Sequence, residues 1–224
     1  MPARELRFIT TKEKGAVSAI LDRPDDARTL LVLGHGSGTN MRHAFIAGLS
    51  AALVEAGVAT FRYQYPYSEK GGGGLDGRKV LLATVREAIA TAAEEAPGLP
   101  LFAGGHSMSG RMTSLAFAEE PLAVQGIVFV AFPLSGGKGP TERAAHFSDV
   151  NTPMLFLQGT KDRLADIDAV ESVCKNLGDR ATLHIIDTAD HGFKVLKRSG
   201  KTHEQTIEEL AAKIAEWTAD VAGV

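Results

Sequence analysis

Ser107 is the side chain of this chain with the clearest nucleophilic setting. It lies in the run Gly-His-Ser-Met-Ser-Gly at 105–110, directly after apolar residues 101–103 and directly before a helical pattern. A serine between small residues, where a strand turns sharply into a helix, is typical of a nucleophile elbow, because larger neighbours would clash with the adjacent strand. Ser109 departs from the usual pattern, which has glycine two residues after the nucleophile.

A serine nucleophile needs a base to take its proton and a carboxylate to orient that base. Asp162 follows residues 154–158, which read as a strand, and therefore points to the edge where open α/β sheets bind ligands. Asp166 and Asp168 are alternatives, but both suit the first turn of the following helix, where a carboxylate caps free N–H groups. We expect Asp162 to be the acid.

His191 is the expected general base, because it lies in the loop after the last expected strand, 182–186. Two other histidines compete with it. His184 alternates within that strand, which favours a structural role. His106 adjoins the serine in sequence, but its side chain should project away from the Ser107 hydroxyl.

The sequence Gly-His-Gly-Ser-Gly at 34–38 follows the apolar residues 30–33 and predicts an oxyanion hole. A backbone N–H from this loop, that of Ser37, would join the N–H of Met108 in binding a negatively charged oxygen.

The sequence lacks the glycines that two common cofactor-binding motifs require. A dinucleotide fingerprint would need glycine where Thr39 stands, and a phosphate-binding loop ending at 200–202 would need glycine in place of Val195. Histidine and cysteine spacings typical of metal sites are missing. We therefore expect no metal and no cofactor.

Polar residues next to the expected site invite a substrate-binding role. Asn40 and Arg42 follow the 34–38 loop, and Arg62 and Tyr65 follow the next strand. A cation and a phenol beside the nucleophile would suit a substrate carboxylate. The alternative, which we favour, is that the arginines bind loop carbonyls and the tyrosine packs.

Apolar runs alternate with helix-period stretches along most of the chain. We expect strands at 6–10, 16–21, 29–34, 58–63, 101–104, 126–131, 153–159 and 181–186, and helices at 42–56, 80–96, 108–119, 167–177 and 203–222. The first two strands should form an antiparallel hairpin at the sheet edge. Continuous apolar strands between helices predict a mostly parallel sheet with helices on both faces. The connection 133–152 has room for one short helix near 141–147, too little for a large lid.

A length of 224 residues favours a single domain spanning residues 1–224, since α/β folds often reach this length as one unit. The net charge of −3 argues against nucleic acid or an anionic membrane surface as the main partner. Cys174 is the only cysteine, so no intrachain disulfide can form, and the N-terminus lacks the apolar core of a signal peptide. A cytoplasmic protein is expected. Oligomeric state leaves no sign in the sequence.

Four longer strings are more specific than the elbow: residues 33–43 (LGHGSGTNMRH), 61–67 (FRYQYPY), 104–112 (GGHSMSGRM) and 190–195 (DHGFKV). With them the chain resembles a family of small α/β-hydrolases related to dienelactone hydrolases and to the hydrolase-like domain of testis-expressed protein 30 and NSL-complex subunit 3. That family often has lysine before the serine and glycine two after it, where this chain has His106 and Ser109.

The resemblance implies an eight-stranded α/β-hydrolase fold with Ser107, Asp162 and His191 as a catalytic triad. The function expected from residues and resemblance together is hydrolysis of a small-molecule carboxylic ester or thioester. The alternative is a catalytically silent hydrolase-like domain used for protein interaction.

Overall fold

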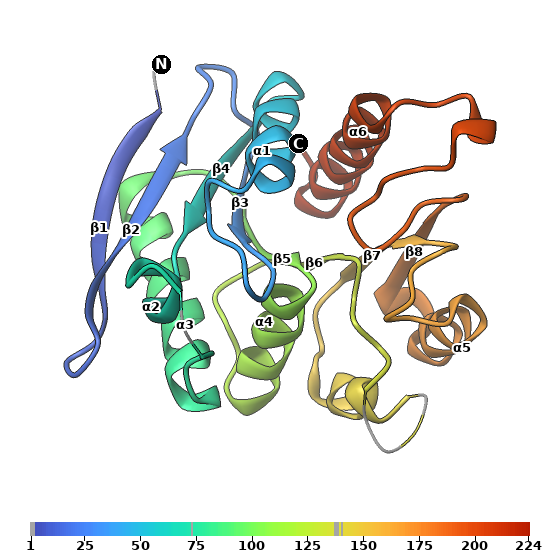
Figure 1. Ribbon diagram of the computed structural model, residues 1–224. Coiled ribbons are helices and arrows are strands. Elements are labelled where there is room, and N and C mark those ends of the chain that lie inside the picture. Colours follow the sequence, from blue (N-terminus) through green and yellow to red (C-terminus); the bar gives the residue numbers. More distant parts are fainter. Residues whose placement is uncertain (1–2, 73, 137–138, 140) are drawn as a thin grey trace.

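The computed structural model describes residues 3–224 except 73, 137–138 and 140, and an eight-stranded sheet runs through the centre of the molecule (Figure 1). Its spatial order is β1-β2-β4-β3-β5-β6-β7-β8. The strands are β1 (Arg4–Thr11), β2 (Gly15–Asp22), β3 (Thr29–Gly34), β4 (Val58–Tyr63), β5 (Leu101–His106), β6 (Ile127–Val130), β7 (Met154–Gly159) and β8 (Ala181–Ile186). β1 and β2 form the antiparallel hairpin at one edge, β2 also pairs antiparallel with β4, and the other pairs are parallel. The predicted mostly parallel sheet is confirmed.

Helices cover both faces of this sheet. They are α1 (Ala44–Glu55), α2 (Pro66–Glu69), α3 (Arg78–Glu95), α4 (Met108–Glu119), α5 (Ile167–Leu177) and α6 (His203–Ala222), with 3-10 helices η1 (Glu142–Asp149), η2 (Gly178–Arg180) and η3 (Lys197–Ser199). α1 and α6 pack together on one face, while α3, α4 and α5 lie on the other (Figure 1). The sequence analysis missed α2, whose signal is a proline at its first position. None of the described helices is long and apolar enough to cross a membrane.

Alternate residues of β3 point to opposite faces, which explains why its apolar run is uninterrupted. Leu31 and Leu33 pack among the side chains of α1 and α6. Leu30 and Val32 pack among those of α3 and α4. Because both faces are covered, every residue of β3 is buried, and a polar position would have cost burial free energy on either side.

The connection from β6 to β7 is short, as predicted. Its described part contains one helix, η1, which is a 3-10 helix at Glu142–Asp149 in place of the helix expected near 141–147. Phe147 ties η1 to the sheet, with its ring centroid 5.4 Å from that of Phe129 and 5.6 Å from that of Phe156. No helical lid covers the sheet edge in the described residues.

The backbones at the ends of β3 and β5 approach each other closely. Gly34 and Gly105 are register partners. A Cβ added to Gly105 would lie 2.2 Å from the carbonyl oxygen of Gly34, and Gly105 has a φ of 141° that L side chains rarely adopt. Only glycine lets the two loops that follow these strands start side by side.

Replacing Gly105 by alanine should therefore destabilise the fold by about 3 kcal/mol or more, from steric overlap and backbone strain together. Urea unfolding measures this change. Gly48→Ala in α1 is the matched control, because the added methyl meets only Ile207, at an ordinary 3.5 Å, and alanine favours a helix by up to about 1 kcal/mol. Equal stability of the two variants would contradict this account of the β3–β5 contact.

Candidate active site

Ser107 occupies the sharp turn between β5 and α4. Its backbone is at φ 51° and ψ −108°, a conformation that is strained for a residue with a side chain and is typical of functional sites. The Ser107 N–H donates to the carbonyl of Val130 at 2.9 Å, which ties the turn to the end of β6. α4 begins at the next residue, Met108, as the elbow motif predicted.

Two hydrogen bonds join Ser107, His191 and Asp162 in series. His191 Nε2 lies 2.9 Å from Ser107 Oγ, and His191 Nδ1 lies 2.8 Å from Asp162 Oδ2. A carboxylate oxygen only accepts, so the ring proton belongs on Nδ1 and the lone pair of Nε2 faces the serine hydroxyl. The arrangement can remove a proton from Ser107.

The Asp162 side chain is fully buried, and both of its carboxylate oxygens accept hydrogen bonds. Gln158 Nε2 donates to Oδ2 at 2.6 Å, and the backbone N–H of Leu164 donates to Oδ1 at 2.8 Å. The rival Asp166 caps α5 instead, accepting from the N–H of Ala169 at 3.1 Å. Sequence reasoning missed Gln158, whose only signal was a polar residue at the end of an apolar strand.

The loop that carries His191 is fixed at two points. His106 Nε2 donates to the His191 carbonyl at 2.8 Å, so His106 holds the base loop and does not face the serine. Burial lowers the pKa of His106 to about 4, which leaves it neutral. Two residues after the base, Phe193 is fully buried and stacks on Phe45 of α1, with ring centroids 5.9 Å apart.

Two backbone N–H groups lie next to the serine. Met108 is the first residue of α4, where helix N–H groups have no intrahelical acceptor. Ser37 follows the end of β3, and both residues line the same hollow as Ser107. Within the described chain, neither N–H donates to another group. Both are free to bind a negatively charged oxygen.

The triad side chains border two separate hollows. Ser107 lies in one of about 250 Å³, which is lined in addition by polar Ser37, Arg111 and Arg143 and by apolar Leu75, Met112 and Leu164. His191 borders a second one of about 670 Å³, together with Lys161, Arg163 and Leu196. Ser107 and His191, which line different hollows, are joined by the 2.9 Å contact between Oγ and Nε2.

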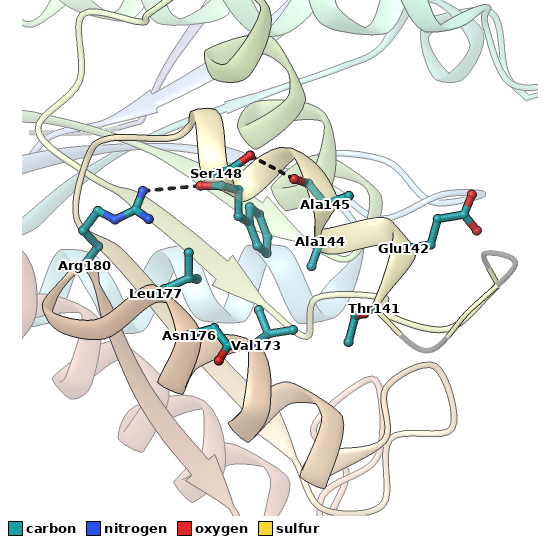
Figure 2. A pocket seen from close by; sticks show the side chains of 10 residues that line it. Thr141, Glu142, Ala144, Ala145, Ser148, Val173, Asn176, Leu177 and Arg180 are labelled. Atoms are coloured by element: carbon teal, nitrogen blue, oxygen red, sulfur yellow. Dashed lines mark hydrogen bonds between the residues drawn. The ribbon is translucent and has the colours of Figure 1, made fainter.

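A third hollow, of about 380 Å³ between η1 and α5, contains none of these residues (Figure 2). It is lined by Ala144, Val173 and Leu177 with Arg180 at one end. Ser107, His191 and Asp162 are not among its lining residues, so it is not the candidate site. Nor do three His, Cys, Asp or Glu side chains gather closely enough to hold a metal ion anywhere in the described residues.

The model of the alpha/beta hydrolase domain matches residues 27–219. The chain belongs to the α/β-hydrolase family.

Solved structures carry the same fold over nearly the whole chain. A lidless serine hydrolase from Xanthomonas campestris is 19% identical, with a TM-score of 0.73 and coverage of 98% of this chain and 95% of its own. Dienelactone hydrolase from Anabaena variabilis is 20% identical, with a TM-score of 0.72 and 97% of each chain covered. The esterase domain of a Rhodothermus marinus protein is 15% identical, with a TM-score of 0.71 and coverage of 97% and 98%. At these identities the comparison shows the fold, an α/β-hydrolase without a lid.

In this α/β-hydrolase, Ser109 fits the elbow because Gly34 makes room for it. A Cβ on Gly34 would lie 2.5 Å from the Ser109 Cβ. Ser109 is fully buried and donates to the carbonyl oxygen of His35. Since that uses its only proton, the Tyr65 hydroxyl, 3.1 Å away, must donate to Ser109, and Tyr63 in turn donates to Tyr65 at 3.1 Å. Ser109 thus ties the turn after β5 to the loop after β3.

The contacts of Arg62 and Tyr65 contradict the substrate-binding role considered for them. Arg62 is 8% exposed and donates to the Met41 carbonyl at 3.1 Å and to Asp22 at 2.9 Å. Tyr65 is fully buried in the network with Ser109, and burial raises its pKa to about 12. Both satisfy internal hydrogen bonds, as the structural alternative proposed.

Asn40 and Arg42 lie on the surface. Asn40 Oδ1 accepts from the Arg42 N–H at 2.8 Å, which closes a local turn, and the Arg42 guanidinium pairs with Glu5 at 2.8 Å. Neither is among the residues that line the Ser107 hollow. Their role in substrate binding stays a prediction.

Replacing Ser109 by alanine should lower the free energy of unfolding by about 1–3 kcal/mol, because it leaves the Tyr65 hydroxyl and the His35 carbonyl buried without their partner. Tyr65→Phe should cost a similar amount. The double variant should cost less than the sum, with a coupling of about 0.5–3 kcal/mol in urea unfolding. Ser148→Ala is the control, since this exposed serine bonds only within η1 and should change stability by less than about 0.5 kcal/mol. Additive losses would mean that the Tyr65–Ser109 contact is not energetically important.

Proposed function

We propose that this α/β-hydrolase is a serine hydrolase of small carboxylic esters or thioesters, with Ser107 as nucleophile, His191 as base and Asp162 as orienting acid. The observation that carries the proposal is the unbroken series of hydrogen bonds from Ser107 Oγ through His191 to Asp162 Oδ2. A serine on a strained strand-to-helix turn, beside two free backbone donors, supports the same chemistry.

The steps follow from the contacts. Ser107 Oγ attacks the carbonyl carbon while its proton passes to His191 Nε2, and the carbonyl oxygen becomes an anion that the N–H groups of Ser37 and Met108 bind. Asp162 stabilises the imidazolium. The C–O or C–S bond then breaks, His191 returns the proton to the leaving alcohol or thiol, and water repeats the sequence to release the acid.

The proton route assigns the two halves of the substrate. His191 must reach the leaving group, so the alcohol or thiol lies toward the second hollow, which His191 borders. The acyl group then occupies the hollow of about 250 Å³ that contains Ser107, Ser37 and Met108. This small volume favours short acyl groups. The neighbours named as an esterase domain and a dienelactone hydrolase act on the same class of bond.

The alternative is a catalytically silent domain that binds other proteins. A complete triad beside two free N–H groups favours the enzyme, because a scaffold needs none of them in this geometry. The resemblance to testis-expressed protein 30 and NSL-complex subunit 3, the single domain and the cytoplasmic location stay predictions from the sequence.

A fluorophosphonate should label the protein covalently at Ser107, because a base-activated serine beside an oxyanion hole attacks phosphorus while ordinary serines do not. Labelling is followed by intact mass and by the mass of the peptide that carries Ser107. Ser107→Ala should abolish labelling, and His191→Ala should slow it by two or more orders of magnitude. Ser114→Ala is the matched control on α4. A folded wild-type protein that stays unlabelled favours the silent domain.

Asp162→Asn should leave the fold intact and lower kcat for a short ester by about 10³–10⁴-fold, because the imidazole loses the anion that fixes its tautomer. Asp166→Asn is the control: asparagine caps a helix as well as aspartate does, so kcat should not change. Steady-state kinetics of both variants decide the assignment. The reverse pattern would move the acid to Asp166.

A further inference from the structure

Arg111 is a charged side chain beside the proposed nucleophile, and no carboxylate of the described residues pairs with it. It lies on α4 one turn after Ser107, and its N–H donates to the Ser107 carbonyl at 3.3 Å. In the described part of the chain its guanidinium forms no hydrogen bond or ion pair, although the Nε atom is buried. A guanidinium presents five donors and is costly to bury without acceptors.

The surroundings of Arg111 add positive charge. Burial, and then the nearby cations Arg143 and Arg78, lower the pKa of Arg111. Arg78 already pairs with Glu119 at 2.8 Å. Among the described residues, neither Arg111 nor Arg143 forms an ion pair with a carboxylate. Neighbouring like charges repel. An anion bound between Arg111 and Arg143 would relieve this repulsion and would accept hydrogen bonds from the Arg111 guanidinium.

The pKa of His146 is affected by the same cluster of cations. Its Nε2 lies 2.8 Å from the Ser114 hydroxyl. Burial lowers its pKa to about 4, and the cations Arg111 and Arg78 contribute to that shift. His146 is therefore neutral near pH 7 and adds no charge of its own.

Arg143 is held firmly at the other side of the hollow. Its Nη1 donates to the Pro133 carbonyl at 3.1 Å and its Nη2 to the Gly136 carbonyl at 3.4 Å, and each of these nitrogens keeps a second N–H for a ligand. The end of η1 is fixed in turn, because Arg180 donates to the carbonyls of Phe147 and Val150. Phe147 also packs into the aromatic cluster of the sheet. The Arg143 guanidinium is thus carried by η1, a helix that is fixed at its end and packed against the sheet.

We propose that Arg111 and Arg143 bind a carboxylate on the acyl half of the substrate, so that the preferred substrates are short monoesters or thioesters of dicarboxylic acids. Both arginines line the hollow that holds Ser107, Ser37 and Met108. This hollow receives the acyl group under the proposed function, on which the inference rests. Apolar Met112, Leu75 and Leu164 in the same lining suit the methylene groups between the ester carbon and the carboxylate.

The test compares monoethyl glutarate with ethyl valerate, which have acyl chains of equal length and the same leaving group. Wild type should hydrolyse the anionic ester with a kcat/KM at least 10-fold higher. Arg111→Gln should lower that kcat/KM by roughly 10- to 100-fold, mainly through KM, and should change the value for ethyl valerate by less than about threefold. Arg111→Lys should recover part of the loss, because it restores the charge but not the planar fork.

Arg4→Gln is the matched charge control. Arg4 lies on the edge strand β1, pairs with Glu95 and is far along the sheet from the hollow. Removing its charge should leave both esters unaffected. A loss with this variant equal to that of Arg111→Gln would show a general field effect and overturn the proposed contact.

A third ester tests which half carries the anion. 4-Acetoxybutyrate has its carboxylate on the alcohol half, and Arg111→Gln should not affect its hydrolysis relative to that of butyl acetate. Equal wild-type kcat/KM for monoethyl glutarate and ethyl valerate would overturn the proposal. So would an Arg111 effect confined to 4-acetoxybutyrate, which would move the anion to the leaving group.

Binding to Ser107→Ala separates this inference from the proposed function. Calorimetry should show that this variant binds monoethyl glutarate and that adding Arg111→Gln weakens binding by at least 10-fold. If fluorophosphonate fails to label wild type while this binding persists, the hydrolase proposal fails and the anion site stands. If labelling and ester hydrolysis depend on Ser107 but the anionic ester has no advantage in rate or binding, only the anion site fails.

Discussion

The close approach of β3 to β5 is the constraint on which the rest of the site depends. Gly105 faces the Gly34 carbonyl with no room for a side chain, and the two strands are neighbours in parallel register. Because both strands end at the same edge, the loop after β3 and the turn after β5 begin side by side. That proximity brings the Ser37 and Met108 N–H groups to one hollow with Ser107.

The strain at Ser107 is held by contacts with other segments. The Ser107 N–H is bonded to Val130 at the end of β6, and Ser109 binds the carbonyl of His35 across the β3–β5 junction. Tyr63 and Tyr65 complete that network from the end of β4. Glycine at position 109 would leave more space in the turn. Serine instead forms hydrogen bonds that fix the loop after β3, at a position where Gly34 leaves room for its side chain.

Charge is distributed unevenly over the same site. The His191 ring is oriented by a buried carboxylate, Asp162, which also accepts from Gln158 and Leu164. The nucleophile hollow instead holds arginines from α4 and η1. His106 and His146 are kept neutral by burial, so neither histidine takes part in this charge balance. Cationic side chains line both hollows, with Arg111 and Arg143 beside Ser107 and Lys161 and Arg163 beside His191, while the carboxylate of Asp162 is buried.

Most of the strands and long helices, and their order along the chain, could be predicted from the sequence. Residues 29–34, 58–63 and 181–186 and helices 108–119, 167–177 and 203–222 were predicted with the bounds that the structure has, because strong apolar periodicity and helix-start signals are local. Local context likewise pointed to Ser107, Asp162 and His191, each at the carboxyl end of a strand. Tertiary structure alone decided which distant group each polar side chain meets. Arg62 and Tyr65 turned inward, Gln158 reached Asp162, and Arg111 met Arg143 across the hollow, since such partners are set by how loops and helices pack and leave no periodic trace in the chain.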